Sequence, residues 1–306
     1  MPKACVCYTI NDGYLLPALV SAVQARRHTD PATTDVMVMV IGEPSEANQA
    51  AAAVAQSLGV ILKLAPKAQI EDHHVMFARL FADVIAGGDY QRLVYIDGDT
   101  QVRGSLAPLV EATIPEGCFL ASRDPAVLFA QLSPQWRRRT DAYRREVGYE
   151  RPYADYFNSG VLIADRAAWP QIRQAALTTL QGHTAGMRFA DQDILNLAVG
   201  DRCRLISNRW NFPGFLIGSQ AERTTRPHIY HFMSNPRPWI EPVRPWGEAW
   251  RRPYVELISQ YPQLRFLEPR KSLGRRLRYW LQQEFKMLTE YGPVGVLAEP
   301  EAQIPI

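Results

Sequence analysis

The first hundred residues alternate short apolar runs with segments of helical periodicity. Three runs have the composition of buried strands, at Ala4–Ile10, 35–41 and Arg92–Ile96. Between them, 15–25 and Glu46–Ser57 carry apolar residues at helical spacing. Strand–helix–strand units form right-handed crossovers and a mostly parallel sheet. The pattern therefore predicts an α/β fold whose ligands bind outside the carboxyl ends of the strands.

Composition narrows the class of protein. The chain has 306 residues, of which 47% are hydrophobic, and a net charge of +3, which is too small to indicate nucleic-acid binding. Its four cysteines lack zinc-ligand spacing, and we expect Cys5 and Cys7 in the core of the first strand. The sequence shows neither a signal-peptide pattern nor an apolar stretch of membrane-spanning length. We expect a cytoplasmic protein, with peripheral attachment to the inner face of the membrane as an alternative.

An acidic turn follows the third strand without a break. Asp97 and Asp99 flank Gly98 in a D-x-D motif, so both carboxylates can share one divalent cation at the strand end. A glycine between them lets a phosphate approach the backbone closely. Many acidic turns are structural calcium loops or solvated turns. The position after a buried strand nevertheless favours a site for a metal-bound diphosphate.

Five segments resemble, in order and spacing, the retaining family 8 glycosyltransferases, the group that includes bacterial lipopolysaccharide galactosyl- and glucosyltransferases and glycogenin. They are residues 8–14, 77–80 with 94–99, 157–163 (FNSGVLI), 191–196 (DQDILN) and 231–239 (HFMSNPRPW). The resemblance implies a GT-A fold, with a Rossmann-like, mostly parallel sheet flanked by helices, over residues 1–250. Residues 251–306 would form a basic helical segment.

The resemblance also implies roles for individual residues. The nucleotide would be bound by Thr9, Asn11, Tyr14, Gly98, Ser234 and Arg237, with Tyr14 stacking on the base. The metal, Mn²⁺ or Mg²⁺, would be held by Asp97, Asp99 and His231. The transferred sugar would meet Asp124, Asn158, Asp191 and Gln192, while Gln192, Asp191 and Arg79 would be catalytic.

Two positions depart from the family pattern. Arg237 replaces a lysine that usually precedes Pro-Trp, and would contact the leaving phosphate. Ser234 stands where a glycine is usual, and its side chain would crowd the phosphate.

The residue at position 192 bears on mechanism. An amide such as Gln192 is a poor nucleophile, so a covalent intermediate is disfavoured. We therefore expect front-face substitution, in which the leaving phosphate helps to deprotonate the acceptor. Asp191 or Asp193 as the nucleophile of a double displacement is the alternative.

Together these patterns predict a retaining hexosyltransferase that moves a hexose from a UDP-sugar to a cell-envelope glycan, such as lipopolysaccharide or an oligosaccharide, with Mn²⁺. Within the same class, the donor could be UDP-glucose or UDP-galacturonate, with another acceptor. Other hypotheses are a non-catalytic homologue that binds nucleotide-sugars, and an unrelated α/β protein whose acidic turn binds calcium.

Two further segments are candidates for acceptor contacts. Residues 125–155 are rich in arginine and aromatic side chains and predict one or two surface helices that face the acceptor. Residues 265–290 carry Arg265, Arg270, Lys271, Arg275, Arg276, Arg278 and Lys286 beside a helical repeat of Leu273, Leu277, Trp280, Leu281, Phe285 and Leu288. Such a helix either lies on an anionic membrane or caps the domain with its arginines in water.

Overall fold

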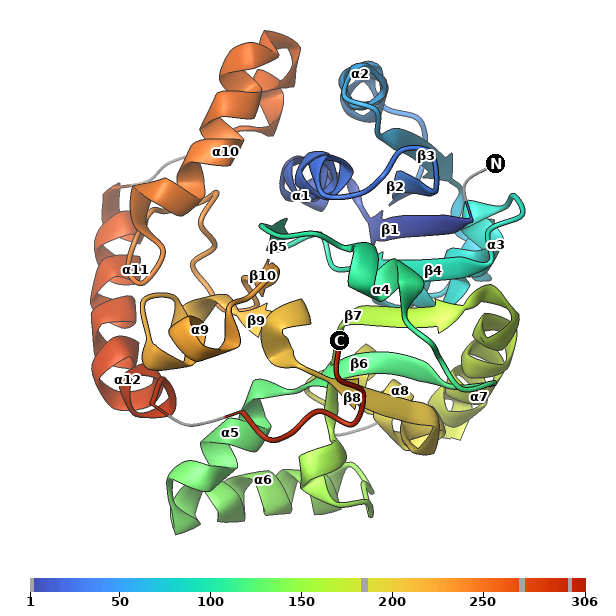
Figure 1. Ribbon diagram of the computed structural model, residues 1–306. Coiled ribbons are helices and arrows are strands. Elements are labelled where there is room, and N and C mark those ends of the chain that lie inside the picture. The colour runs from blue at the N-terminus through green and yellow to red at the C-terminus, as the bar shows by residue number, and fades with distance from the viewer. Residues whose placement is uncertain (1–2, 183–186, 270–272, 297–298) are drawn as a thin grey trace.

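The computed structural model describes residues 3–182, 187–269, 273–296 and 299–306 (Figure 1). Arg270 and Lys271 of the predicted basic tail lie outside the described residues. No helix in the described ranges is both long and apolar enough to cross a membrane.

A seven-stranded sheet organises the chain, in the order β3-β2-β1-β4-β7-β6-β8. Its strands are β1 (Ala4–Ile10), β2 (Thr34–Ile41), β3 (Ile61–Ala65), β4 (Arg92–Ile96), β6 (Phe119–Arg123), β7 (Phe157–Asp165) and β8 (Cys203–Ile206). All neighbouring pairs are parallel except those of β7, which runs antiparallel to β4 and β6. The predicted α/β class and mostly parallel sheet are confirmed.

Two hydrophobic cores cover the two faces of the sheet. On one face, Val6, Tyr8 and Ile10 of β1 pack with α1 (Leu15–Arg27) and α2 (Glu46–Ser57). On the other, Cys5 and Cys7 pack with α3 (Ala82–Ala86), α7 (Trp169–Gly182) and α8 (Ala190–Val199). Alternate residues of a strand point to opposite faces, so both cores share β1. The predicted burial of Cys5 and Cys7 is confirmed.

Some local predictions need correction. The helical spacing of apolar residues over 77–85 predicts one helix. These residues begin instead in a 3-10 helix, η3 (Val75–Phe81), that leads into α3. The chain after Asn208 is rich in proline, tryptophan and glycine, a composition that predicts irregular structure. It nevertheless contains α9 (Gln220–Thr225) and α10 (Gly247–Gln260). Pro253 lies inside α10, where burial of Tyr254, Leu257 and Ile258 outweighs the lost hydrogen bond.

A second, three-stranded sheet starts immediately after the acidic turn. It consists of β5 (Thr100–Val102), β10 (Ile229–His231) and β9 (Phe212–Pro213), with β10 in the middle. β5 and β10 are antiparallel and pair His231 with Thr100. The backbone N–H of Phe232 donates to the carbonyl of Asp99 at 2.9 Å. This pairing brings a segment from the last third of the chain to Asp97 and Asp99.

The remaining helices lie outside the two sheets (Figure 1). The expected surface helices of residues 125–155 are present as α5 and α6. α10 includes residue 250, the expected boundary between the first segment and the basic helical segment. The chain then continues to α11 along the side of the molecule (Figure 1). Bounds of these elements are α4 (Ala107–Glu111), α5 (Pro125–Leu132), α6 (Pro134–Glu146), η8 (Gly214–Leu216), η9 (Pro262–Leu267), α11 (Leu273–Lys286), η10 (Met287–Tyr291, a π-helical turn) and α12 (Gly292–Val294).

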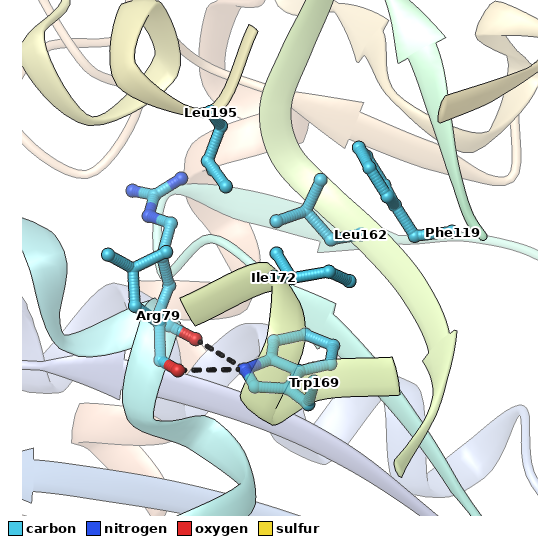
Figure 2. Close-up of a pocket in the computed structure, with 7 residues that line it drawn as sticks. Arg79, Phe119, Leu162, Trp169, Ile172 and Leu195 are labelled. Carbon is cyan, nitrogen blue, oxygen red and sulfur yellow. Dashed lines mark hydrogen bonds between the residues drawn. The ribbon is translucent and has the colours of Figure 1, made fainter. Parts of the chain in front are cut away.

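Trp169, at the start of α7, fixes the backbone beneath Arg79. Its indole N–H lies 3.0 Å from the carbonyl of Leu80 and 3.2 Å from that of Arg79. Figure 2 shows the ring beside a small apolar cavity lined by Phe119, Leu162, Ile172 and Leu195. The tryptophan thus anchors the 3-10 helix that carries Arg79.

We predict that Trp169→Phe lowers the free energy of unfolding by about 1–2 kcal/mol, because it removes the buried hydrogen bonds from the indole N–H to the carbonyls of Arg79 and Leu80. Urea denaturation measures the loss. Trp280→Phe, at an exposed position of α11, serves as the control and should change stability by less than about 0.5 kcal/mol. Equal stability of Trp169→Phe and the wild type would contradict this role of the indole.

Candidate active site

A single pocket of about 760 Å³ opens at the carboxyl edge of the main sheet. The carboxyl ends of β1, β4 and β6 meet there, and antiparallel β7 contributes its amino end. The pocket is lined by every residue predicted for the site: Thr9, Asn11, Tyr14, Arg79, Asp97, Gly98, Asp99, Asp124, Asn158, Asp191, Gln192, Ser234, Arg237 and His231. Residues from the five segments that resemble the family, together with Asp124, are thus brought to one place.

Asp97, Asp99 and His231 form a group that could hold a cation. One ligand atom from each lies within 4.8 Å of the others. Nε2 of His231 is 3.1 Å from Oδ1 of Asp99 and 3.7 Å from Oδ2 of Asp97. Gly160 makes room for the imidazole, because a Cβ at that position would lie 2.4 Å from Cε1 of His231. Two carboxylates and an imidazole are a donor set that suits a divalent transition metal.

A residue that sequence reasoning missed orients the histidine. The side-chain nitrogen of Asn211 is 2.8 Å from Oδ1 of Asn158, so its Oδ1 is left to accept from Nδ1 of His231 at 2.9 Å. Placing the proton on Nδ1 leaves the lone pair of Nε2 facing the carboxylates. Asn211 is fully buried beside β9. Its role depends on a contact between distant segments, so no local sequence signal marks it.

Two arginines balance the buried carboxylates. Nη2 of Arg79 lies 3.1 Å from Asp97 and 2.9 Å from Asp191, and Nη1 of Arg237 lies 2.7 Å from Asp99. Burial opposes ionisation of Asp99, but His231 and Arg237 outweigh it and hold the pKa of Asp99 well below its ordinary value. At Asp97 burial prevails over the attraction of Arg79 and raises the pKa. The two carboxylates therefore differ in their protonation behaviour.

The histidine is tuned by the same charges. Burial disfavours the imidazolium, yet the attraction of Asp99 and Asp97 is stronger and raises the pKa of His231. A cation and a proton would compete for Nε2, because a metal ligand must be the neutral imidazole.

A second polar group lies next to the first. Oδ2 of Asp124 accepts from the amides of Asn158 and Gln192, each at 3.0 Å. Oε1 of Gln192 in turn accepts from the backbone N–H of Ser159 at 3.2 Å. Burial raises the pKa of Asp124 against these hydrogen bonds. Because Asn158 also contacts Asn211, one hydrogen-bonded chain links His231 to Gln192.

The two aspartates that flank Gln192 have different surroundings. Asp191 faces the pocket, where Arg79 and the hydroxyl of Ser159 contact it. Asp193 is fully buried, does not line the pocket, and accepts from the hydroxyls of Tyr143 and Tyr156. Asp193 therefore lacks the access that a nucleophile needs.

The opposite end of the pocket carries the predicted nucleotide side chains. Tyr14 is 38% exposed and its ring meets the edge of Trp239 at a centroid distance of 6.2 Å. A Cβ on Gly98 would lie 2.9 Å from Ile10 and 3.2 Å from Ala18, so packing of the turn also demands glycine here. The buried hydroxyl of Ser234 has no hydrogen-bond partner among the described residues.

The comparisons with known proteins agree with this geometry. The sequence model of glycosyl transferase family 8 matches residues 5–242. A putative glycosyltransferase of Haemophilus influenzae is 31% identical over 40% of the chain and 34% of its own length. The lipopolysaccharide glucosyltransferase WaaO of Escherichia coli is 23% identical over 71% of the chain and 63% of its own length. The chain thus spans about a third to two thirds of these curated relatives.

A solved structure shares the fold over most of both chains. The galactosyltransferase LgtC, determined with donor and acceptor sugar analogues, superposes with a TM-score of 0.62 at 21% identity, covering 84% of this chain and 96% of that one. Because the family match spans most of the sequence, the chain belongs to glycosyl transferase family 8. Membership rules out an unrelated fold in which the acidic turn holds a structural calcium ion.

We predict that Asn211→Leu weakens the affinity for Mn²⁺ in the presence of UDP about 10- to 100-fold, because His231 loses the acceptor that fixes its tautomer. Titration of free Mn²⁺ by electron paramagnetic resonance measures the affinity. Asn211→Asp keeps an acceptor for Nδ1 of His231, so its affinity for Mn²⁺ should fall less than that of Asn211→Leu. Equal affinities for the wild type and Asn211→Leu would refute the positioning role.

Proposed function

We propose that this chain is a retaining hexosyltransferase that transfers a hexose from a UDP-sugar to a cell-envelope glycan, with Mn²⁺ as its metal. The observation that carries the proposal is the juxtaposition, in one pocket, of the group Asp97–Asp99–His231 with the group Asp124–Gln192. The first group has the chemistry to hold a leaving diphosphate, and the second can surround the sugar attached to it.

Departure of the diphosphate is the step that needs the most charge compensation. Asp97, Asp99 and His231 would hold the metal, which as a Lewis acid neutralises negative charge on the leaving phosphate. Arg79 and Arg237 are positive charges already fixed beside it. The unpartnered hydroxyl of Ser234 can donate to a phosphate oxygen, which supports a binding role where the family usually has glycine.

The sugar half of the pocket supports front-face substitution. Both ends of the Gln192 amide are held by hydrogen bonds, which fix its orientation in the pocket. It would lie beside the sugar and support an oxocarbenium-like transition state. The inaccessible position of Asp193 disfavours it as a nucleophile. Asp191 faces the pocket but is paired with Arg79, which lowers its nucleophilicity. The leaving phosphate would then accept the proton of the acceptor hydroxyl.

The donor sugar and acceptor are the finer part of the proposal. WaaO is described as a lipopolysaccharide glucosyltransferase and LgtC as a galactosyltransferase, which supports a UDP-hexose donor and a lipopolysaccharide or oligosaccharide acceptor. UDP-glucose or UDP-galacturonate are the alternative donors. The complete set of charged groups favours catalysis over a homologue that only binds nucleotide-sugars.

We predict that UDP raises the melting temperature only when Mn²⁺ is present, since ligand binding to the folded state adds about 2.7 kcal/mol at a hundredfold excess over Kd. Asp99→Ala should abolish this shift. For any UDP-sugar that the wild type hydrolyses, the variant should reduce the rate of hydrolysis about 100-fold or more. Asp201→Ala, an exposed acid outside the pocket, is the matched control. A wild type that gives no thermal shift with UDP and Mn²⁺ would defeat the proposal.

The proposal includes attachment to the inner face of the membrane through α11. This helix packs on the domain with polar groups: Arg276 pairs with Glu241 at 3.0 Å, and buried Gln283 donates to the carbonyl of Arg244. Four of its apolar side chains face outward, with Leu277, Trp280, Leu281 and Phe285 between 49% and 65% exposed. We name these four residues the apolar stripe.

The orientation of α11 bears on the two alternatives for the tail. A helix that only capped the domain would turn its apolar side inward, but this one turns it to solvent. Arg275 and Arg278 are exposed on the same helix. An apolar stripe flanked by arginines suits insertion into an anionic membrane surface, where each cation contributes about 1 kcal/mol.

We predict that the protein floats with vesicles containing phosphatidylglycerol but not with pure phosphatidylcholine, and that added salt weakens the association. Replacing Trp280 and Phe285 together by glutamate should abolish flotation. Val255→Glu alters a similarly exposed apolar residue on α10 and should have no effect. Flotation of the double variant at the wild-type level would refute docking through the stripe.

A further inference from the structure

Four aromatic rings form a continuous wall on one side of the pocket. The ring of Trp136 lies 5.2 Å from that of Phe129, which lies 6.0 Å from Phe215, and Phe215 stacks on Tyr291 at 4.4 Å. The rings come from α6, α5, η8 and η10, and all four line the pocket. We name them the aromatic wall.

The two halves of the aromatic wall differ in how far their rings are exposed to the pocket. Phe215 and Tyr291 are buried and stacked nearly parallel, so they hold the C-terminal segment against the catalytic domain. Phe129 and Trp136 are only half-buried. The backbone N–H of Trp136 donates to the hydroxyl of Ser133, whereas its indole N–H has no hydrogen-bond partner among the described residues. The outer half therefore presents aromatic faces and a free donor to whatever enters the pocket.

The order of strands places the aromatic wall away from the predicted nucleotide end. Thr9 lies near the carboxyl end of β1 and Asn11 directly follows this strand, whereas Asp124 directly follows β6 and caps α5. β4 and β7 lie between β1 and β6, so their ends are roughly 14 Å apart at the usual strand spacing. The wall thus continues the pocket beyond Asp124 and Gln192, on the side from which a second substrate would approach the sugar.

Charged groups beside the wall indicate the chemistry of its ligand. Glu290 is half-buried, lines the pocket, and has no side-chain partner among the described residues. The guanidinium of Arg139 lies 5.4 Å over the Trp136 ring. An acyl chain against the wall would leave the carboxylate of Glu290 desolvated without a hydrogen bond. A pyranose offers apolar C–H groups on one face, which can pack against the aromatic wall, and hydroxyl donors at its rim, which can bind the carboxylate of Glu290.

We propose, on the basis of the function proposed above, that the aromatic wall and Glu290 form the binding subsite for an acceptor pyranose. The ring of the acceptor packs against Trp136 and Phe129, and Glu290 accepts from one of its hydroxyls. Another hydroxyl then points toward Asp124 and Gln192, where the sugar is transferred. The C-terminal segment therefore completes the acceptor site in addition to carrying the apolar stripe.

The subsite is tested by saturation-transfer NMR with methyl β-glucoside, methyl β-galactoside and methyl β-lactoside on protein loaded with UDP and Mg²⁺, since Mg²⁺ is diamagnetic. At least one glycoside should bind the wild type. Trp136→Ala and the isosteric Glu290→Gln should each weaken that binding about tenfold. Phe266→Ala removes an exposed ring outside the pocket and should leave glycoside binding unchanged.

Affinity for UDP is measured on the same samples by calorimetry. Both subsite variants should retain it within about twofold, because among the described residues no hydrogen bond, ion pair or ring contact joins either side chain to a predicted nucleotide residue. Absence of glycoside binding to a wild type that binds UDP would overturn the subsite, as would wild-type glycoside affinity in both variants. Parallel loss of UDP and glycoside affinity would mean that the wall is only structural. A wild type that binds no UDP would instead refute the proposed function.

Discussion

The pairing of β5 with β10 is the contact on which the site depends. It begins one residue after the acidic turn and joins residues more than a hundred positions apart in the chain. The hydrogen bond from the backbone N–H of Phe232 to the carbonyl of Asp99 fixes the position of His231 relative to the two carboxylates. Without this short sheet, Asp97 and Asp99 would remain an ordinary acidic turn at the end of a buried strand.

Concentrating buried charge in this way has an energetic cost that the neighbouring residues offset. Asp97, Asp99 and Asp191 gather at one point, and like charges at such distances repel strongly in a partly desolvated site. Arg79 bridges two of these carboxylates and Arg237 holds the third. The same cations would face a bound diphosphate. The charges that stabilise the free site are thus already oriented for its ligand, which is what preorganisation requires.

The C-terminal segment connects two surfaces of the molecule. α11 turns the apolar stripe outward, and η10, which continues it, places Glu290 and Tyr291 in the pocket. A glycan attached to a lipid would meet both surfaces, since its sugar must reach the pocket while its lipid stays in the bilayer. The reversed polarity of α11, with Gln283 inward and Trp280 outward, is explained more directly by such an acceptor than by packing alone.

The sequence by itself determined the sheet and the members of the site. Strong apolar runs such as Arg92–Ile96, and the helical spacing of Glu46–Ser57, are local patterns that dictate local structure. The five segments that resemble the family contain thirteen of the fourteen predicted pocket residues, and Asp124, directly after β6, is the fourteenth.

Only the tertiary structure decided how these residues are supported. Asn211 acts through His231 and Asn158, and Trp136, Glu290 and Tyr291 reach the pocket from α6 and η10. The sequence likewise did not determine which side of α11 faces solvent, because amphipathic spacing identifies a helix but not the side on which it docks. Such contacts join distant segments, and the physical reason they escaped prediction is that no local pattern encodes which surfaces meet when the chain packs.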